Sequence, residues 1–242
     1  VGSTVGIIAL FVNLLIGASV GVNVVIAHYL GVTGHDREIS RSLHTAVTLA
    51  LAGGVLLGGV GVLAADAALQ LMSVPTDVRP LALLYVRIYF LGTPFTMLYN
   101  YGAAALRAKG DTQRPLYCLS LAGVVNIVLN LFFVIVCHLD VAGVAIATVI
   151  SQAASAAWTL RFLTGRKTIL RIRPISMKPH LKTISSITAL GLSGFMMSIT
   201  NSIVQVVCNS TLSSYGGDLY VGVMTVINSI REIVSMPVSG IT

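Results

Sequence analysis

Long apolar segments constrain this chain more than any other feature of its sequence. Seven of them are long enough for an α-helix to cross a bilayer, which takes about 20 residues. They cover residues 4–30, 43–72, 81–106, 116–138, 141–163, 184–212 and 219–242, with polar residues between them. Because a backbone inside lipid must satisfy its own hydrogen bonds, these segments predict an all-α membrane protein, a polytopic helical bundle embedded in the lipid bilayer.

The composition excludes two other classes of protein. Charged residues make up 10% of the chain and hydrophobic residues 55%, whereas soluble domains carry roughly 25% charged residues and disordered chains have low hydrophobicity. The three cysteines lie in apolar segments without a Cys-x-x-Cys pair, so we expect neither a metal site nor a disulfide. The first residue is Val1, and we expect the sequence to be part of a longer protein.

Basic residues alternate between the connections that join the apolar segments. The first, third and fifth connections hold eleven of the fifteen Lys and Arg residues, whereas the second, fourth and sixth hold only Arg79. By the positive-inside rule, the connections that carry Arg37, Lys109 and Arg171 face the cytoplasm of a multi-pass protein in the plasma or inner membrane. The net charge of +7 therefore reports topology, and we expect no nucleic-acid partner.

The longest connection, residues 165–183, is strongly basic and divides the chain. Five apolar segments precede it within residues 1–164, and two follow within residues 184–242. It is interpreted as a loop that joins two helical bundles and fixes their topology. The alternative is a patch that binds anionic lipid headgroups.

Polar side chains recur at helical spacing inside several apolar segments. Amide and hydroxyl groups separated by three or four residues share one helix face, and this holds in three segments for Asn126 and Asn130, for Thr148, Ser151, Gln152 and Ser155, and for Asn201, Gln205 and Asn209. Such groups either bond neighbouring helices together or line a wet cavity. Stripes on three separate helices favour a shared cavity, lined by amides that donate and accept hydrogen bonds without titrating.

Glycine and proline predict two further features. Five glycines between Gly53 and Gly61 would let another helix approach closely. Pro94 and Pro237 lie inside apolar segments and should kink their helices.

Arg231 and Glu232 are adjacent, so they point about 100° apart on a helix and cannot simply pair. Either they lie at a helix boundary or one of them contributes to a functional site.

Five motifs in this order and spacing resemble the MATE (multidrug and toxic compound extrusion) transporters. They are the segments Ala27–Gly31, Tyr85–Phe95, Leu106–Pro115, Asn126–Asn130 and Val141–Gln152. The resemblance covers essentially the whole chain. It implies a two-lobed fold of twelve helices, of which this chain contains helices two to eight. Residues 1–164 would form helices two to six of the N-lobe, 165–183 the loop between the lobes, and 184–242 the first two helices of the C-lobe.

The resemblance also implies a function. MATE proteins export organic cations and other amphipathic compounds by alternating access, driven by inward H⁺ or Na⁺. The implied partners are therefore such a small molecule, the coupling ion and the bilayer, for a monomeric transporter with no other cofactor and no enzymatic activity. The resemblance and the polar stripes together place seven residues in the substrate and cation cavity: Tyr85, Asn126, Asn130, Thr148, Gln152, Asn201 and Gln205.

Two positions depart from the family pattern. Asn130 stands where the family usually carries an aspartate, and Asn201 stands where some members carry a coupling glutamate. Neither amide can bind a proton at these positions. Ion coupling is therefore expected to depend on the aspartate of the family's helix one, which lies outside this sequence, on Glu232, or on residues downstream.

Two other functions stay open at this point. A lipid-linked oligosaccharide flippase of the same superfamily would usually line its cavity with several cationic residues, whereas these stripes are neutral. A membrane scaffold without transport activity would have no reason to place amides on three helices.

Overall fold

The computed structural model describes residues 5–32, 36–71, 77–165 and 180–197, together with isolated positions from 199 to 230. Its regular elements are all helices over that part of the chain, which confirms the predicted fold class. They are α1 (Val5–Leu30), α2 (Asp36–Leu71), α3 (Arg79–Leu91), α4 (Thr93–Ala108), α5 (Gln113–Leu131), the π-helical segment η2 (Phe132–Val136) and α6 (Asp140–Leu163), followed by a helix over residues 181–197.

The chain divides into two compact units, Val1–Met196 and Met197–Thr242, and the elements analysed below belong to the first. Within the described residues, four helices are each long and apolar enough to cross a membrane, and α3 and α4, which meet at a bend of 45°, pass the same test when counted as one span. These five spans agree with the five apolar segments expected before residue 165. The bend lies at the position of Pro94, as the sequence predicts. Most of the 165–183 connection is outside the described residues, and its role as a boundary between lobes stays a prediction.

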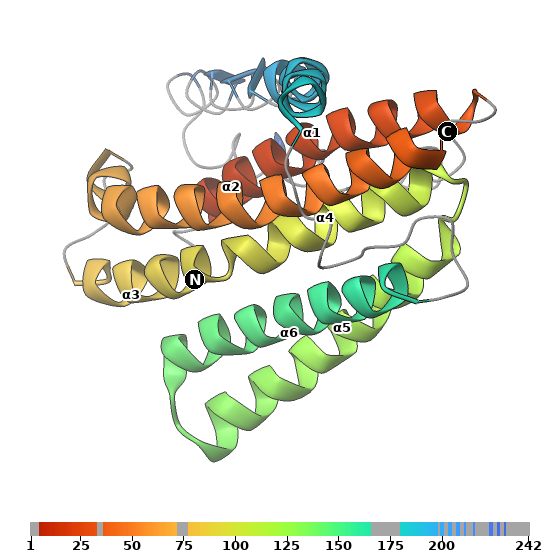
Figure 1. Ribbon diagram of the computed structural model, residues 1–242. Coiled ribbons are helices and arrows are strands. Elements are labelled where there is room, and N and C mark those ends of the chain that lie inside the picture. Colours follow the sequence, from red (N-terminus) through yellow and green to blue (C-terminus); the bar gives the residue numbers. More distant parts are fainter. Residues whose placement is uncertain are drawn as a thin grey trace. The chain divides into compact units, whose positions relative to one another are not determined.

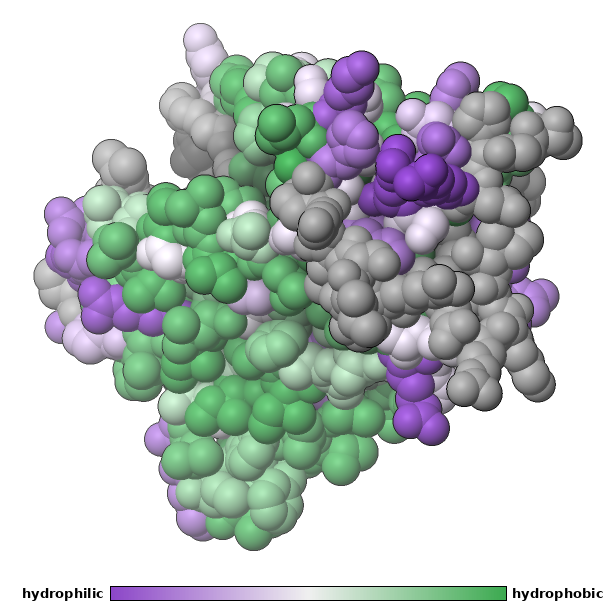
Figure 2. All heavy atoms as spheres, viewed as in Figure 1, coloured by the Kyte–Doolittle hydropathy of each residue, from purple (hydrophilic) through white to green (hydrophobic). Residues whose placement is uncertain are grey.

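The bent pair α3–α4 lies at the centre of the first unit (Figure 1). On one side α4 packs against α1 and α2, and on the other side both α3 and α4 pack against α6. Helix α5 lies outermost and packs mainly against α6. Its exposed face is a row of large apolar side chains, and the surface over α5 and α6 is broadly hydrophobic (Figure 2). This is the surface expected of helices that face lipid.

The glycines of α2 bring its backbone against the break between α3 and α4. A Cβ atom at Gly54 would lie 2.5 Å from the Cα of Pro94, and one at Gly58 would lie 2.6 Å from the carbonyl oxygen of Phe90. That carbonyl loses its helical partner because Pro94 has no N–H. The predicted close approach is therefore confirmed at Gly54 and Gly58, but not at Gly59, around which no atom lies within 4 Å of a Cβ.

The second helix begins earlier than the hydropathy predicts. The apolar segment was expected from residue 43, with Arg37 and Arg41 in the preceding loop, but α2 begins at Asp36 and includes both arginines. Ile39 and Leu43 are buried in this first part, so packing against the core stabilises turns that contain charged residues. The arginines remain at the end of the helix where the topology prediction places them.

The contact between α2 and the helix break predicts a specific effect on stability. We expect Gly54→Ala to destabilise the protein by about 1–3 kcal/mol, because the added methyl group meets backbone that cannot move aside. Gly59→Ala is the matched control on the same helix, and it should be neutral or stabilise by up to about 1 kcal/mol through helix propensity. The measurement is the free energy of unfolding of the full-length protein in detergent micelles. Equal effects of the two substitutions would contradict the packing described here.

Candidate functional site

Polar side chains from α3, α5 and α6 converge on one cluster in the first unit. Helix α5 contributes Asn126 and Asn130, which share one face because they are four residues apart. Helix α6 contributes Thr148 and Ser151 on the face that it turns toward α5. The amides and hydroxyls lie inside spans where the surrounding side chains are apolar, so each polar group is best satisfied by a protein partner.

Asn126 is the centre of the hydrogen-bond network in this cluster. Its Nδ2 donates to the Oγ1 of Thr148 at 3.4 Å and to the Oγ of Ser151 at 3.2 Å. Its Oδ1 accepts from the Nδ2 of Asn130 at 3.0 Å. The two hydroxyls in turn donate to backbone carbonyls of α6, Thr148 to Val144 at 2.9 Å and Ser151 to Thr148 at 2.8 Å. The network thus fixes the orientation of both amides.

Two tyrosines of α3 face the same stretch of α6. The hydroxyl of Tyr85 interacts with Thr148, and that of Tyr89 with Gln152. The two rings stack with centroids 6.4 Å apart, and both side chains are buried. They bring aromatic surface next to the amide and hydroxyl groups.

Gln152 lies against the break in the bent helix. A Cβ atom at Gly92 would lie 2.5 Å from the Oε1 of Gln152, so a side chain at this position would require the amide end of Gln152 to move. The Oε1 atom of Gln152 and the Oδ1 atom of Asn130 are both buried, and neither has a hydrogen-bond partner within the described chain. Buried acceptors without partners are rare in folded proteins, and these two could accept from a ligand, from water or from a cation.

The cluster contains no charged side chain, and the described residues hold no group of three His, Cys, Asp or Glu side chains that could bind a metal ion. Its chemistry is therefore limited to hydrogen bonding by neutral groups and to aromatic contact. Such a site can hold a ligand reversibly.

The structure brings together five of the seven predicted cavity residues: Tyr85, Asn126, Asn130, Thr148 and Gln152. The other two, Asn201 and Gln205, lie outside the described residues. Tyr99 of α4 does not join the cluster, because its hydroxyl donates to the carbonyl of Pro115 at 3.2 Å. The sequence analysis did not predict the contact between Gly92 and Gln152. The Gly-Thr-Pro sequence at the helix break could have indicated it.

Comparison with known proteins assigns the class that this fold and polar interior suggest. A family model described as MatE matches residues 1–132. The "Probable multidrug resistance protein YpnP" of Bacillus subtilis (strain 168) is 30% identical over 184 residues, which cover 74% of this chain and 40% of the relative. The "Multidrug export protein MepA" of Staphylococcus aureus (strain bovine RF122 / ET3-1) is 25% identical over 201 residues, which cover 81% of this chain and 44% of the relative.

A solved structure, "Crystal structure of MATE in the bent conformation", matches 99% of this chain and 53% of its own with a TM-score of 0.92 at 24% identity. This match shows a shared fold. The protein is thus a multi-pass helical membrane protein, and its chain belongs to the MatE family. This chain matches half or less of the length of these curated relatives.

The network around Asn126 predicts energetic coupling between α5 and α6. In a double-mutant cycle, Asn126→Ala and Ser151→Ala should show a coupling energy of roughly 0.6 kcal/mol, the average for such bonds in membranes. The cycle is measured on the free energy of unfolding of the full-length protein. Pairing Asn126→Ala with Ser186→Ala is the control, because the Ser186 hydroxyl bonds only within its own helix, to Lys182. Coupling as large in the control would argue against a direct contact.

Proposed function

We propose that the full-length protein is a secondary active exporter of amphipathic organic cations, working by alternating access between two lobes. The observation that carries this proposal is the neutral cluster of amides, hydroxyls and tyrosines between three spans of a MatE family chain. The names of YpnP and MepA, as multidrug resistance and multidrug export proteins, support the same substrate class. On this proposal the protein transports its substrate unchanged and is not an enzyme.

The residues of the cluster would act by holding the substrate without selecting one charge pattern. The buried acceptors of Asn130 and Gln152 offer oxygen atoms to hydrogen-bond donors of varied geometry. Tyr85 and Tyr89 offer ring surface to apolar and cationic parts of the ligand. Asn201 and Gln205 stay part of the proposal from the sequence alone, as amides predicted to bind the same substrate.

The driving force must enter elsewhere, because an amide at residue 130 cannot exchange protons. We propose that H⁺ or Na⁺ drives transport through an acidic residue outside this cluster, either Glu232 or one supplied by other helices of the full-length protein. A ligand or ion shifts a conformational equilibrium only if it binds the two states differently, and a carboxylate that changes its protonation or its ion between states meets this requirement.

Efflux from whole cells tests the proposed function. Cells that express the full-length gene are loaded with a fluorescent organic cation, and efflux is recorded under separately imposed H⁺ and Na⁺ gradients. Export that accelerates with one inward gradient, and stops when that gradient is dissipated, is the expected result. Efflux that responds to neither gradient for any cation tested would argue against the proposal and favour the lipid-linked oligosaccharide flippase.

Substitution of Asn130 separates binding from coupling. We expect Asn130→Ala to weaken substrate binding about threefold to tenfold, since one neutral hydrogen bond contributes about 0.5–1.5 kcal/mol, while the dependence of transport on pH is kept. The substrate Kd and the pH profile of transport are measured on the same purified, reconstituted protein. Loss of the pH dependence would show that residue 130 takes part in coupling. Asn130→Asp is the companion variant, and it should add a titrating step to the profile.

A further inference from the structure

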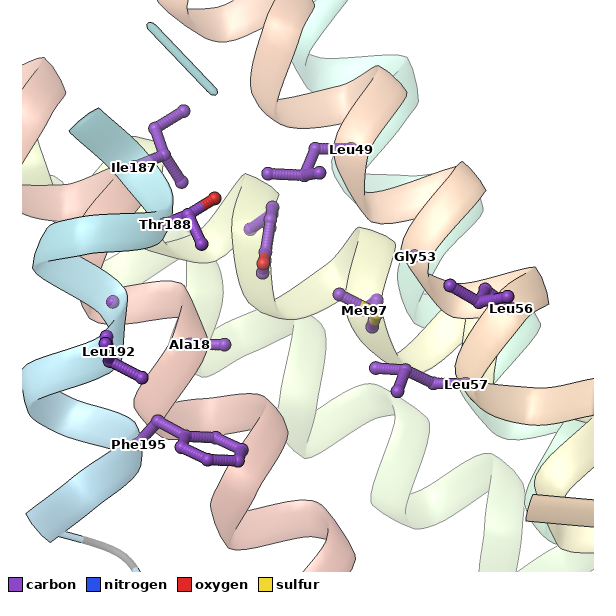
Figure 3. Close-up of a pocket in the computed structure, with 12 residues that line it drawn as sticks. Ala18, Leu49, Gly53, Leu56, Leu57, Met97, Ile187, Thr188, Leu192 and Phe195 are labelled. Carbon is purple, nitrogen blue, oxygen red and sulfur yellow. The ribbon is translucent and has the colours of Figure 1, made fainter. Parts of the chain in front are cut away.

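The first unit contains an apolar pocket on the other side of α4 from the polar cluster. It is a pocket of about 360 Å³ lined by residues of α1, α2, α4 and the 181–197 helix. Figure 3 shows the walls: Leu49 and Leu57 extend from α2, Met97 from α4, and Ile187 and Phe195 from the 181–197 helix. Its volume falls within the range of small-molecule sites, which is about 300–1,000 Å³.

The lining of this pocket is almost entirely hydrocarbon. Of its twelve residues only Tyr101 and Thr188 carry a polar side chain, and none carries a charge. Water needs two to four polar partners to occupy a cavity, so these walls do not favour it. They also offer no carboxylate that could pair with a cationic substrate. The chemistry of the walls selects an apolar, uncharged occupant.

The depth of the pocket in the membrane identifies the source of that occupant. Helix α2 carries no charged residue between Arg41 and Asp66, and Gly53, in the pocket wall, lies at the centre of this stretch. This places the pocket near the bilayer midplane, where lipid chains end. Leu56 and Leu192 at its rim are 67% and 51% exposed, whereas Met97 and Ile187 inside it are 3% and 1% exposed. The rim continues into the apolar outer face of α2, where Val55 and Val60 are also exposed.

A tight contact between helices fixes one wall of the pocket. A Cβ atom at Gly191 would lie 2.8 Å from the carbonyl oxygen of Ala18, and one at Gly194 would lie 2.6 Å from that of Gly17. Because Gly191 and Gly194 have no side chains, the 181–197 helix can pack closely against α1. Beside this contact it leaves the space toward α2 and α4 open, and the pocket occupies that space.

From this geometry we infer that the pocket binds the end of an acyl chain of a membrane phospholipid. The chain enters past Leu56 and Leu192 and contacts the side chain of Met97. It fills apolar space that would otherwise lack contact atoms, which is unfavourable in a packed protein. This lipid site is separate from the proposed transport cavity and does not depend on the transport function.

Photolabelling of the full-length protein tests the inference. The protein is reconstituted in vesicles of phosphatidylethanolamine and phosphatidylglycerol that contain a phosphatidylglycerol with a diazirine at the end of one acyl chain. After irradiation, mass spectrometry maps the labelled residues. We expect label on Met97 but not on Phe90, which is equally buried at 4% exposure on the same bent helix and does not line the pocket. An unlabelled Met97 would overturn the inference, because another part of the full-length protein would then cover the pocket.

Two tryptophan substitutions on α2 provide a matched comparison. A Cβ atom at Gly53 would lie 3.4 Å from the Cε of Met97, so Gly53→Trp fills the pocket and should reduce labelling of Met97 at least fivefold. Gly59→Trp adds the same side chain where the space is open and should leave labelling within twofold of the wild type. Equal labelling in both variants would contradict the proposed site. If Gly53→Trp does not fold, the wild-type contrast between Met97 and Phe90 decides the question alone.

A competition experiment distinguishes lipid from substrate. Labelling of Met97 is repeated with a saturating concentration of tetraphenylphosphonium, an amphipathic cation. Unchanged labelling is expected, since the pocket lining has none of the amide oxygens with which the polar cluster is proposed to hold the cation. Displacement of the label by this cation would overturn the inference and assign the pocket to the transport pathway.

Discussion

The close contact between α2 and the break in the α3–α4 helix organises the rest of the first unit. Pro94 removes the ordinary helical donor to the carbonyl of Phe90, which accepts at the cap of α3 instead, and Gly58 lets α2 approach that carbonyl directly. On the other side of the break, Gly92 leaves room for Gln152 of α6. The bend of 45° is thus held from both sides by positions without side-chain bulk. A rigid lobe needs such a fixed bend, because hydrophobic attraction between helices is weak inside lipid and packing must replace it.

The same bend distributes two kinds of chemistry to opposite sides of the helix. Helix α3 carries Tyr85 and Tyr89 toward the amides and hydroxyls of α5 and α6. Helix α4 carries Met97 and Tyr101 toward the apolar pocket beside α2 and the 181–197 helix. In a straight helix, the side chains of α3 would point in other directions relative to those of α4. The position of the helix break therefore decides which residues meet the polar cluster.

Much of this arrangement could be predicted from the sequence because membranes impose strong rules. Hydropathy indicates the spans, and the spacing of Asn126, Asn130 and Thr148 places them on helix faces that do meet. What the sequence could not predict depends on contacts between distant residues. Nothing in the hydropathy distinguishes Gly58, which touches the bent helix, from Gly59, which faces open space. Likewise, the early start of α2 depends on burial of Ile39 and Leu43 by other helices. The pocket depends on the approach of α1 and the 181–197 helix, which lie far apart in the chain.

The neutrality of the polar cluster constrains how such a protein can couple transport to an ion gradient. Asn126 bonds to Asn130 and to two hydroxyls of α6, and none of these groups gains or loses a proton in the ordinary pH range. On the proposed mechanism, the cluster keeps its shape while the driving ion binds elsewhere, and its affinity for the substrate changes only when the two lobes move. Coupling by lobe movement requires that the lobe itself does not deform. The glycine contacts at the bend of α3–α4 pack α2 tightly against the break, which suits a lobe that is proposed to move as one body.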